Sequence, residues 1–387
     1  MRPALLLLLA STLALPAAIP AACAAPGSDS PAEASHGDVS WTVEADSSQR
    51  AKGQVQFSLT RRTANSRWTH SNTRPLAAFD GLTAAQLESD TGTQVSFRLN
   101  RDAGTIVCEG VARRWHGTGD CSFRPDAAFA SALAERGYGR AGDGQLFSLA
   151  LYDLGYAYLD ELKRQGYARP TVADLVRAGE HGADFAYLKA MGGHGYRVGN
   201  LGALIAMRDH GVTPDYVSEL ARLGIADLSS DQVIRLRDHG VTPDFVGGFR
   251  AAGYNVPLDQ LIRLRDHGVT PDYVRQLAAY GIRGAPADEL VRLRDHGVAP
   301  DFVGEASRHG YRFSTDQLIR LRDHGVTAAY LGELKALGYA GLAAEDFVKL
   351  RTHGVTADFV RRVNASGGSR RSAAELVSLR IGGWAER

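Results

Sequence analysis

The sequence predicts an α+β protein, in which a small antiparallel β domain precedes an α-solenoid of about nine helix-turn-helix repeats of 28 or 29 residues. Three observations predict this organisation. A short apolar run opens the chain, apolar and polar residues then alternate, and segments related to LRDHGVTPDYV recur through the second half. We expect four parts: a signal peptide at 1–24, a flexible linker at 25–37, a β-rich domain at 38–138 and the repeat array at 139–387.

The first residues predict export. Arg2 is followed by an apolar run from Pro3 to Leu15, which spans 13 residues, whereas a membrane-spanning helix needs about 20. This pattern indicates a cleaved secretory signal peptide and no transmembrane span after its removal. The small residues around Cys23 fit cleavage after Ala24. In a second interpretation Cys23 is lipidated and attaches the protein to a membrane, although Pro20 occupies the place of the usual Leu or Val.

Composition restricts the class of partner. The segment from Pro26 to Gly37 combines Pro, Gly, Ser and acidic residues without apolar periodicity, so we expect a flexible tether. The whole chain has 44 basic and 43 acidic side chains, for a net charge of +1. A protein that binds a polyanion through its overall charge would show a basic excess, so nucleic acid is not expected as a partner.

Alternation with a period of two residues predicts β-strands after the tether. It is clear in Trp41/Val43, in Val55/Phe57/Leu59 and in Val95/Phe97/Leu99. Such alternation is typical of strands that bury one face. A glycine-rich hairpin from Thr105 to Phe123 and a short helix from Asp126 to Arg136 are expected to complete the domain.

Two cysteines remain once the signal peptide is removed, Cys108 and Cys121. An even count in an oxidising compartment indicates one disulfide. If the two residues face each other across the hairpin, the turn falls at Arg114-Trp115. Neither cysteine belongs to a Cys-x-x-Cys motif, so we expect a structural bridge rather than a redox centre. A disulfide that closes a loop of about 14 residues stabilises the fold by about 3 kcal/mol in the chain-entropy model.

The repeat is defined by a column of histidines. They stand at His181, His210, His239, His267, His296, His324 and His353, at intervals of 28 or 29 residues. Extending the interval by one unit at each end reaches Tyr152 and Gly382, where the neighbouring residues still match. The terminal units are therefore degenerate, as expected for units with one face that has no neighbour.

Each unit is expected to contain two helices. The first begins at a capping box such as Ser229-x-x-Gln232 and stops at a His-Gly pair, where Gly211 and its equivalents can adopt the left-handed conformation. The second begins at Thr-Pro-Asp, with Thr213 as N-cap and Pro214 as first helical residue. Two helices this short cannot bury both apolar faces alone, so neighbouring units must stack into one core.

The histidine column invites a metal-binding hypothesis, which helix packing disfavours. Stacked helices lie about 8–10 Å apart, whereas zinc ligands lie about 2.0–2.1 Å from the metal. A single ion therefore cannot bridge equivalent histidines, and no unit contains a second His or Cys at ligand spacing. We expect no metal and no cofactor, and we interpret each histidine as the end of a helix, where an imidazole interacts favourably with the helix dipole.

A stripe of arginines with following aspartates is the candidate partner-binding surface. Its residues are Arg235, Arg237, Arg263, Arg265, Arg292, Arg294, Arg320 and Arg322. In one interpretation they form an inter-repeat ladder of exposed ion pairs, each worth about 0–1 kcal/mol. In the other, paired guanidinium groups grip the acidic groups of a peptide or polymer. Solenoids do build extended binding surfaces from repeated side chains.

The units, typified by LIRLRDHGVTPDYVRQLAAYG from Leu261 to Gly281, resemble repeats of uncharacterised exported bacterial proteins. Similar units form the tails of some antirepressor metallopeptidases of the β-lactam-sensor type. The resemblance covers about Leu146 to Leu379 and is specific in the His-Gly-Val-Thr-Pro-Asp core. The zinc-binding helix and the membrane helices of those peptidases have no counterpart in this sequence, so their protease activity does not carry over. The resemblance implies a sensing or partner-docking module of a bacterial envelope.

The functional expectation is a non-enzymatic, exported periplasmic scaffold that binds a protein or peptide of the cell envelope. The sequence contains no His-Glu-x-x-His, Gly-x-Ser-x-Gly, phosphate-loop or Ser-x-x-Lys motif. The alternative is a hydrolase that acts on an envelope polymer at a site between the two domains. A third hypothesis is a spacer that holds the β domain away from a membrane if Cys23 is lipidated.

Overall fold

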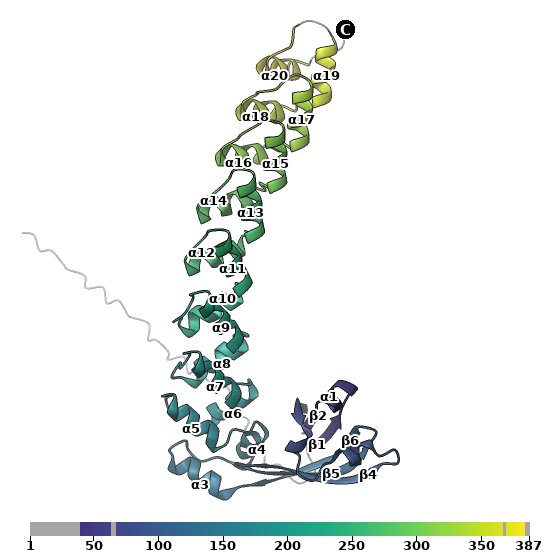
Figure 1. Cartoon of the computed structure of the whole chain (residues 1–387), viewed down its shortest axis with the longest axis vertical. Helices are drawn as coiled ribbons and strands as arrows, with labels where there is room; N and C mark the ends of the chain where they lie inside the picture. Colours follow the sequence, from purple (N-terminus) through teal and green to yellow (C-terminus); the bar gives the residue numbers. More distant parts are fainter. Residues whose placement is uncertain (1–38, 63–66, 367–368, 384–387) are drawn as a thin grey trace, which may run out of the picture.

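The computed structural model describes residues 39–62, 67–366 and 369–383. The expected signal peptide, the linker and Cys23 lie outside these residues. A six-stranded sheet lies at one end of the described chain, and a gently curved rod of helices leads away from it (Figure 1). The expected α+β architecture with helical repeats is confirmed.

The sheet is antiparallel throughout, with the strand order β3-β2-β1-β6-β5-β4. Its strands are β1 (Val39–Glu44), β2 (Gln54–Arg62), β3 (Arg67–Pro75), β4 (Thr93–Arg101), β5 (Gly104–Arg113) and β6 (His116–Pro125). Short helices lie between strands, namely α1 (Ser47–Ala51), η1 (Leu76–Ala78) and α2 (Ala84–Glu88). The central position of β1 means that the first and last strands of the domain pair with each other.

One face of the sheet is apolar and the other is polar, as the alternation predicts. Trp41 and Phe97 are fully buried and contact each other edge to face. Between the buried residues of β1, Ser40 and Thr42 lie on the exposed face. Since the side chains of a strand point alternately to its two faces, the expected half-buried strands are confirmed.

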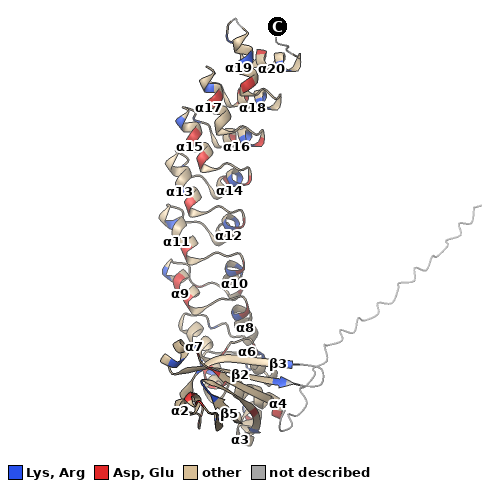
Figure 2. Cartoon of the chain, turned by 90° about the vertical axis from the view of Figure 1, so that its right-hand side faces the viewer, with Lys and Arg blue, Asp and Glu red and all other residues tan. Residues whose placement is uncertain are grey.

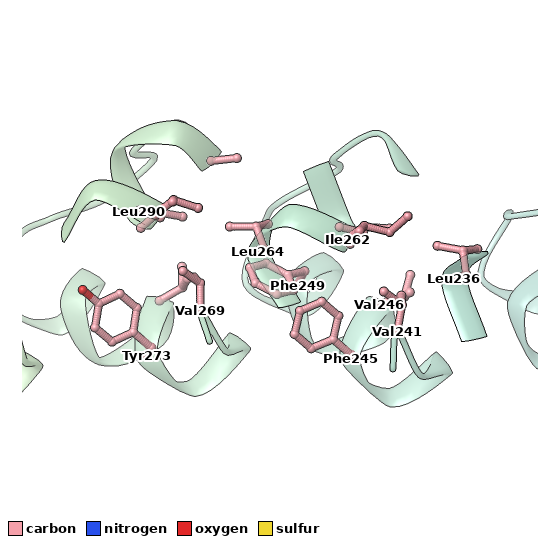
Figure 3. Close-up of a cluster of buried hydrophobic side chains, with 14 of the residues drawn as sticks. Leu236, Val241, Phe245, Val246, Phe249, Ile262, Leu264, Val269, Tyr273 and Leu290 are labelled. Carbon is pink, nitrogen blue, oxygen red and sulfur yellow. The ribbon is translucent and has the colours of Figure 1, made fainter. Parts of the chain in front are cut away.

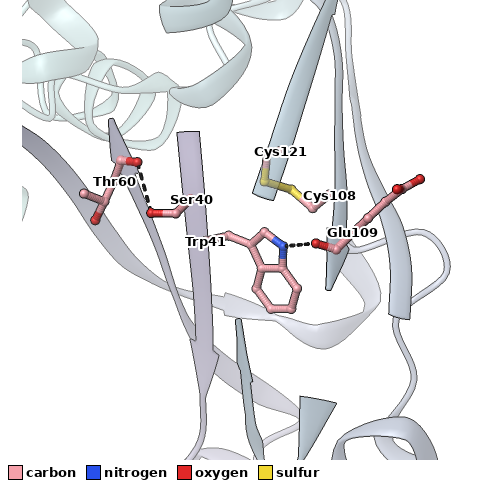
Figure 4. Close-up of a disulfide and its surroundings, with 6 residues drawn as sticks. All are labelled: Ser40, Trp41, Thr60, Cys108, Glu109 and Cys121. Atoms are coloured by element: carbon pink, nitrogen blue, oxygen red, sulfur yellow. Dashed lines mark hydrogen bonds between the residues drawn. A yellow bond between two sulfur atoms is a disulfide. The ribbon is translucent and has the colours of Figure 1, made fainter. Parts of the chain in front are cut away.

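The disulfide between Cys108 and Cys121 is present, and the two residues are directly opposed on β5 and β6 (Figure 4). The turn between these strands consists of Arg114 and Trp115, both with positive φ. Two successive residues with positive φ are typical of a tight hairpin turn, because the twist of that turn matches the twist of the two strands. The indole Nε1 of Trp41 donates to the carbonyl of Glu109 beside the disulfide, at 3.0 Å.

A short helix, α3 (Ala127–Glu135), connects the sheet to seventeen further helices of nine residues each. The first helices of the units are α4 (Asp143–Leu151), α6 (Val172–Glu180), α8 (Leu201–Asp209), α10 (Ser230–Asp238), α12 (Leu258–Asp266), α14 (Ala287–Asp295), α16 (Thr315–Asp323), α18 (Ala344–Thr352) and α20 (Ala373–Ile381). The second helices are α5 (Tyr156–Arg164), α7 (Phe185–Gly193), α9 (Pro214–Arg222), α11 (Pro243–Ala251), α13 (Pro271–Ala279), α15 (Pro300–Arg308), α17 (Ala328–Ala336) and α19 (Ala357–Ala365). First helices stack on first helices and second on second, in two columns along the rod.

The predicted caps define the helix ends. Ser229 and Gln232 form a reciprocal capping box, and the Thr213 hydroxyl accepts from the backbone N–H of Tyr216. Gly211 has a φ of 69°. The N–H of Gly211 and that of Val212 donate back to carbonyls of α8, which satisfies the last turn. Local sequence therefore specifies these helix ends, whereas α12, α14 and α15 begin after Pro257, Pro286 and Ala299 without a side-chain cap.

The core runs continuously between the units (Figure 3). Leu264 of α12 and Phe249 of α11 are fully buried, and Leu290 of the next first helix belongs to the same cluster. At the base, α4 belongs to both cores: Leu149 faces the array, whereas Phe147 packs with the sheet. The sheet thus covers the first unit as a cap would.

Candidate binding surface

One long edge of the rod consists of the ends of the first helices and the His-Gly turns that follow them. We call it the turn edge; in one unit it extends from Arg263 to Thr270. The leucines of each Arg-Leu-Arg-Asp-His segment are buried, so the charged residues between and after them lie at the surface. In the ribbon of Figure 2, positions of Lys and Arg (blue) and of Asp and Glu (red) recur from unit to unit along the rod.

The histidines form a ladder along the turn edge. In five successive units, the imidazole Nδ1 is hydrogen-bonded to the aspartate Oδ1 of the following unit at 2.7–2.9 Å. The pairs are His181–Asp209, His210–Asp238, His239–Asp266, His267–Asp295 and His296–Asp323. The next histidine, His324, is 3.2 Å from the hydroxyl of Thr352, which replaces the aspartate.

Each histidine is also the C-cap of its first helix, as the sequence predicts. The hydrogen bond from the histidine to the next unit was not predicted, because these aspartates were expected to pair with arginines. The spacing contains the signal: an aspartate follows each of these histidines after 27 or 28 residues. In the described part of the chain, no group of three or more His, Cys, Asp or Glu is arranged to hold a metal ion.

The predicted arginine stripe divides into two columns with different partners. We call the first column the paired arginines. Each forms an ion pair with an acid in the first turn of the next first helix: Arg235–Asp259, Arg263–Asp288, Arg292–Asp316 and Arg320–Glu345. The charge of these four guanidinium groups is therefore balanced across the boundary between units.

The second column, the stacked arginines, contacts aromatic rings instead. Each guanidinium lies over the ring of the preceding unit's second helix, with its carbon 5.1–5.5 Å from the ring centroid. The pairs are Arg208–Tyr187, Arg237–Tyr216, Arg265–Phe245, Arg294–Tyr273, Arg322–Phe302, Arg351–Tyr330 and Arg380–Phe359. The distances are those of cation–π contacts. Four of these seven arginines belong to the arginine stripe that the sequence predicted.

Below the guanidinium groups, tyrosine hydroxyls connect the units. The hydroxyl of Tyr216 donates to the carbonyl of Val241 at 2.7 Å, and that of Tyr273 donates to Val298 at 2.8 Å. Burial raises the pKa of both hydroxyls to about 12. Phe302 lacks the hydroxyl, and Arg322 of the following unit donates to the equivalent carbonyl, that of Val326, at 3.2 Å. The aromatic column therefore both closes the unit boundary and supports the stacked arginines.

The contact between sheet and array is filled by side chains. Arg74 of β3 donates to the carbonyl of Leu151 at 2.8 Å, and Asp102 accepts from the backbone N–H of Tyr156 at 2.8 Å. Phe123 and Phe147 pack edge to face, with ring centroids 5.4 Å apart. These contacts anchor the first unit to the sheet at the place where the hydrolase hypothesis requires a cleft.

A hollow of about 680 Å³ lies between the end of α3, helix α5 and the loop that follows α5. Its wall includes Tyr138, Lys163 and Arg169. Arg136 and Asp160, which also line it, form an ion pair at 2.8 Å, and the side chain of Asp160 is 64% exposed. Of the two acids that line this hollow, Asp160 is thus solvated and paired, and Glu135 is exposed.

No protein-family model matches this chain, and no protein of curated function matches it either. No helix of the described residues is long and apolar enough to cross a membrane. The geometry of the turn edge is therefore the main indication of function.

Proposed function

We propose that this protein is a non-enzymatic, exported scaffold whose helical array binds a protein or peptide partner of the cell envelope. The observation that carries the proposal is the turn edge, where the same exposed groups recur in the same environment from unit to unit. A repeated surface on a rod of stacked units suits an extended partner, because each unit adds an equivalent contact. The disulfide fits an oxidising compartment, which supports the export expected from the N-terminal residues.

The experiment is site-specific photo-crosslinking of the full chain in living cells. The probe replaces His353, an exposed residue of the turn edge that faces no aspartate, since Ile381 occupies that position in the last unit. The control probe replaces Gln276, an exposed residue on α13. A partner captured at the turn edge but not from α13 supports the proposal. Equal capture at both positions, or capture at neither, contradicts it.

Export is tested separately by sequencing the N-terminus of the mature protein. Cleavage after Ala24 leaves Ala25 as the first residue. Membrane fractionation of a Cys23→Ala variant separates a free periplasmic protein from a lipidated one. If wild type and variant fractionate alike, lipid attachment through this cysteine is excluded.

A further inference from the structure

We infer that the stacked arginines bind an extended acidic peptide whose carboxylates recur at every third residue. This inference depends on the proposed function and specifies the chemistry of the partner. Three observations carry it: the missing carboxylate partners, the exposure of the guanidinium groups and their support by aromatic rings. The spacing expected for packed helices then selects the kind of peptide.

The first observation concerns charge. Among the residues that the structure describes, none of the seven stacked arginines forms an ion pair with a carboxylate, whereas the paired arginines next to them do. The acid next to a stacked arginine in the sequence has another partner. Asp266, which follows Arg265, is hydrogen-bonded to His239 of the preceding unit. The ion pairs along the turn edge therefore include the paired arginines but not the stacked arginines.

The second observation is exposure. Six of the seven stacked arginines are exposed, and Arg322 is half-buried. Arg322 and Arg351 also donate through Nε to the preceding His-Gly turn, at 3.1 Å to the carbonyls of Gly297 and Gly325. A guanidinium has five N–H donors, so such a contact leaves further donors for an incoming group.

The third observation is preorganisation. Each guanidinium lies over a ring that is itself packed at the unit boundary, so the arginine side chain is already held in one place. Holding it beforehand reduces the conformational entropy that binding would otherwise cost. Arginine that stacks on an aromatic face is also well suited to two-pronged recognition of a carboxylate.

The expected spacing of the column selects the kind of peptide, because the helices that carry successive stacked arginines pack on each other. Stacked helices of neighbouring units lie about 8–10 Å apart. A polyproline II peptide has three residues per turn and rises about 3.1 Å per residue, so every third side chain returns to the same side after about 9 Å. In a β-strand, side chains on one face recur after about 6.6–6.8 Å and drift out of register along the array. An acidic peptide in the polyproline II conformation therefore matches the column.

The test measures binding of synthetic peptides to the full mature chain by fluorescence anisotropy at low salt. The ligand consists of repeating Glu-Pro-Pro triplets, one for each stacked arginine. The comparison peptide has the same composition with its glutamates in one block. We expect the triplet peptide to bind at least about tenfold more tightly, because only its carboxylates reach successive arginines. Equal affinity for the two peptides would overturn the inference.

A matched pair of variants tests the column itself. Arg265→Gln removes a stacked arginine, and Arg263→Gln removes a paired arginine from the same helix with the same change in net charge. Arg265→Gln is expected to weaken binding about two- to fivefold, the range for one exposed ion pair. Arg263→Gln is expected to change it less than about twofold. Equal losses would show that only overall charge matters, and would refute the role of the column.

Two further controls keep the result interpretable. Circular dichroism melting of each variant shows whether it is folded, and Arg265→Lys retains the charge without the planar fork. We expect Arg265→Lys to bind more weakly than wild type and more tightly than Arg265→Gln. Polyphosphate and unlabelled triplet peptide are compared as competitors of the labelled triplet peptide. If polyphosphate displaces it at the lower concentration, the acidic-peptide assignment is wrong. If the triplet peptide fails to bind while the turn-edge crosslink persists, this inference fails and the proposed scaffold function stands.

Discussion

The buried hydroxyl of Tyr273 offers a direct test of how the units are joined. In a Tyr273→Phe variant the ring remains, and Phe245 and Phe302 at the equivalent positions show that the column accepts phenylalanine. The lost contact is a buried hydrogen bond of 2.8 Å to the carbonyl of Val298. Such a bond contributes about 0.5–1.5 kcal/mol, and a buried carbonyl left without a donor costs about 1–3 kcal/mol. We expect a destabilisation of about 1 kcal/mol.

The effect should be local, because each unit contacts only its neighbours. Hydrogen–deuterium exchange is the suitable assay: about 1 kcal/mol corresponds to an approximately fivefold loss of protection. The loss is expected in α13 and α15 but not in α5 or α7. Tyr280→Phe is the matched control, since the side chain of Tyr280 is among the exposed large hydrophobics, at 38%. If both variants exchange alike, the hydroxyl does not contribute to the unit boundary and the reasoning is wrong.

The same hydroxyl predicts behaviour at alkaline pH. Burial raises the pKa of Tyr273 from 10.0 to about 12. A pKa that is higher in the folded state means that the protonated hydroxyl stabilises the fold. This contribution is complete below pH 10 and is lost as the pH rises from about 10 to 12. Tyrosinate absorbance should therefore show that Tyr273 ionises near pH 12 while the chain is folded, and near pH 10 in denaturant. Ionisation near pH 10 in the folded chain would contradict the hydroxyl's burial.

Three further predictions follow from the packing. Gly248→Ala is expected to destabilise the array by about 1–3 kcal/mol, since its new Cβ would lie 2.7 Å from Pro271. In the control Gly247→Ala, the nearest atom to the new Cβ is 3.7 Å away, and the higher helix propensity of alanine should stabilise the array by up to about 1 kcal/mol. Urea denaturation measures the free energy of unfolding of both variants. Thr352→Asp should give His324 the aspartate partner that five other histidines of the array have, and stabilise that boundary by about 0–1 kcal/mol in urea denaturation. Reduction of the disulfide should destabilise the sheet by about 3 kcal/mol while leaving exchange in the distant units unchanged.

Local chemistry explains why the sequence predicts so much of this fold. A capping box, a Thr-Pro start and a His-Gly stop each act within one turn of helix, so their effect needs no knowledge of the neighbouring unit. The same holds for the hairpin: facing cysteines placed the turn at Arg114 and Trp115, where both residues adopt positive φ. In each case the relevant partners lie close together in the sequence.

The candidate site was only partly predictable for the opposite reason. The eight arginines of the sequence stripe look equivalent, yet Arg263 pairs with Asp288 and Arg265 stacks on Phe245. The difference depends on the side of the first helix from which each arginine side chain extends. Residues two positions apart on a helix do not share a face, so one points to the next unit and the other to the preceding one.

By itself, the sequence determined the number of units, the ends of their helices, the strand alternation and the disulfide. It did so because period, caps and turns are properties of neighbouring residues. Only the tertiary structure decided which columns meet: His267 with Asp295, Tyr273 with Val298, and Arg294 with the ring of Tyr273. These contacts depend on the register in which one unit stacks on the next. That register is set by the shape of the shared core rather than by any local signal.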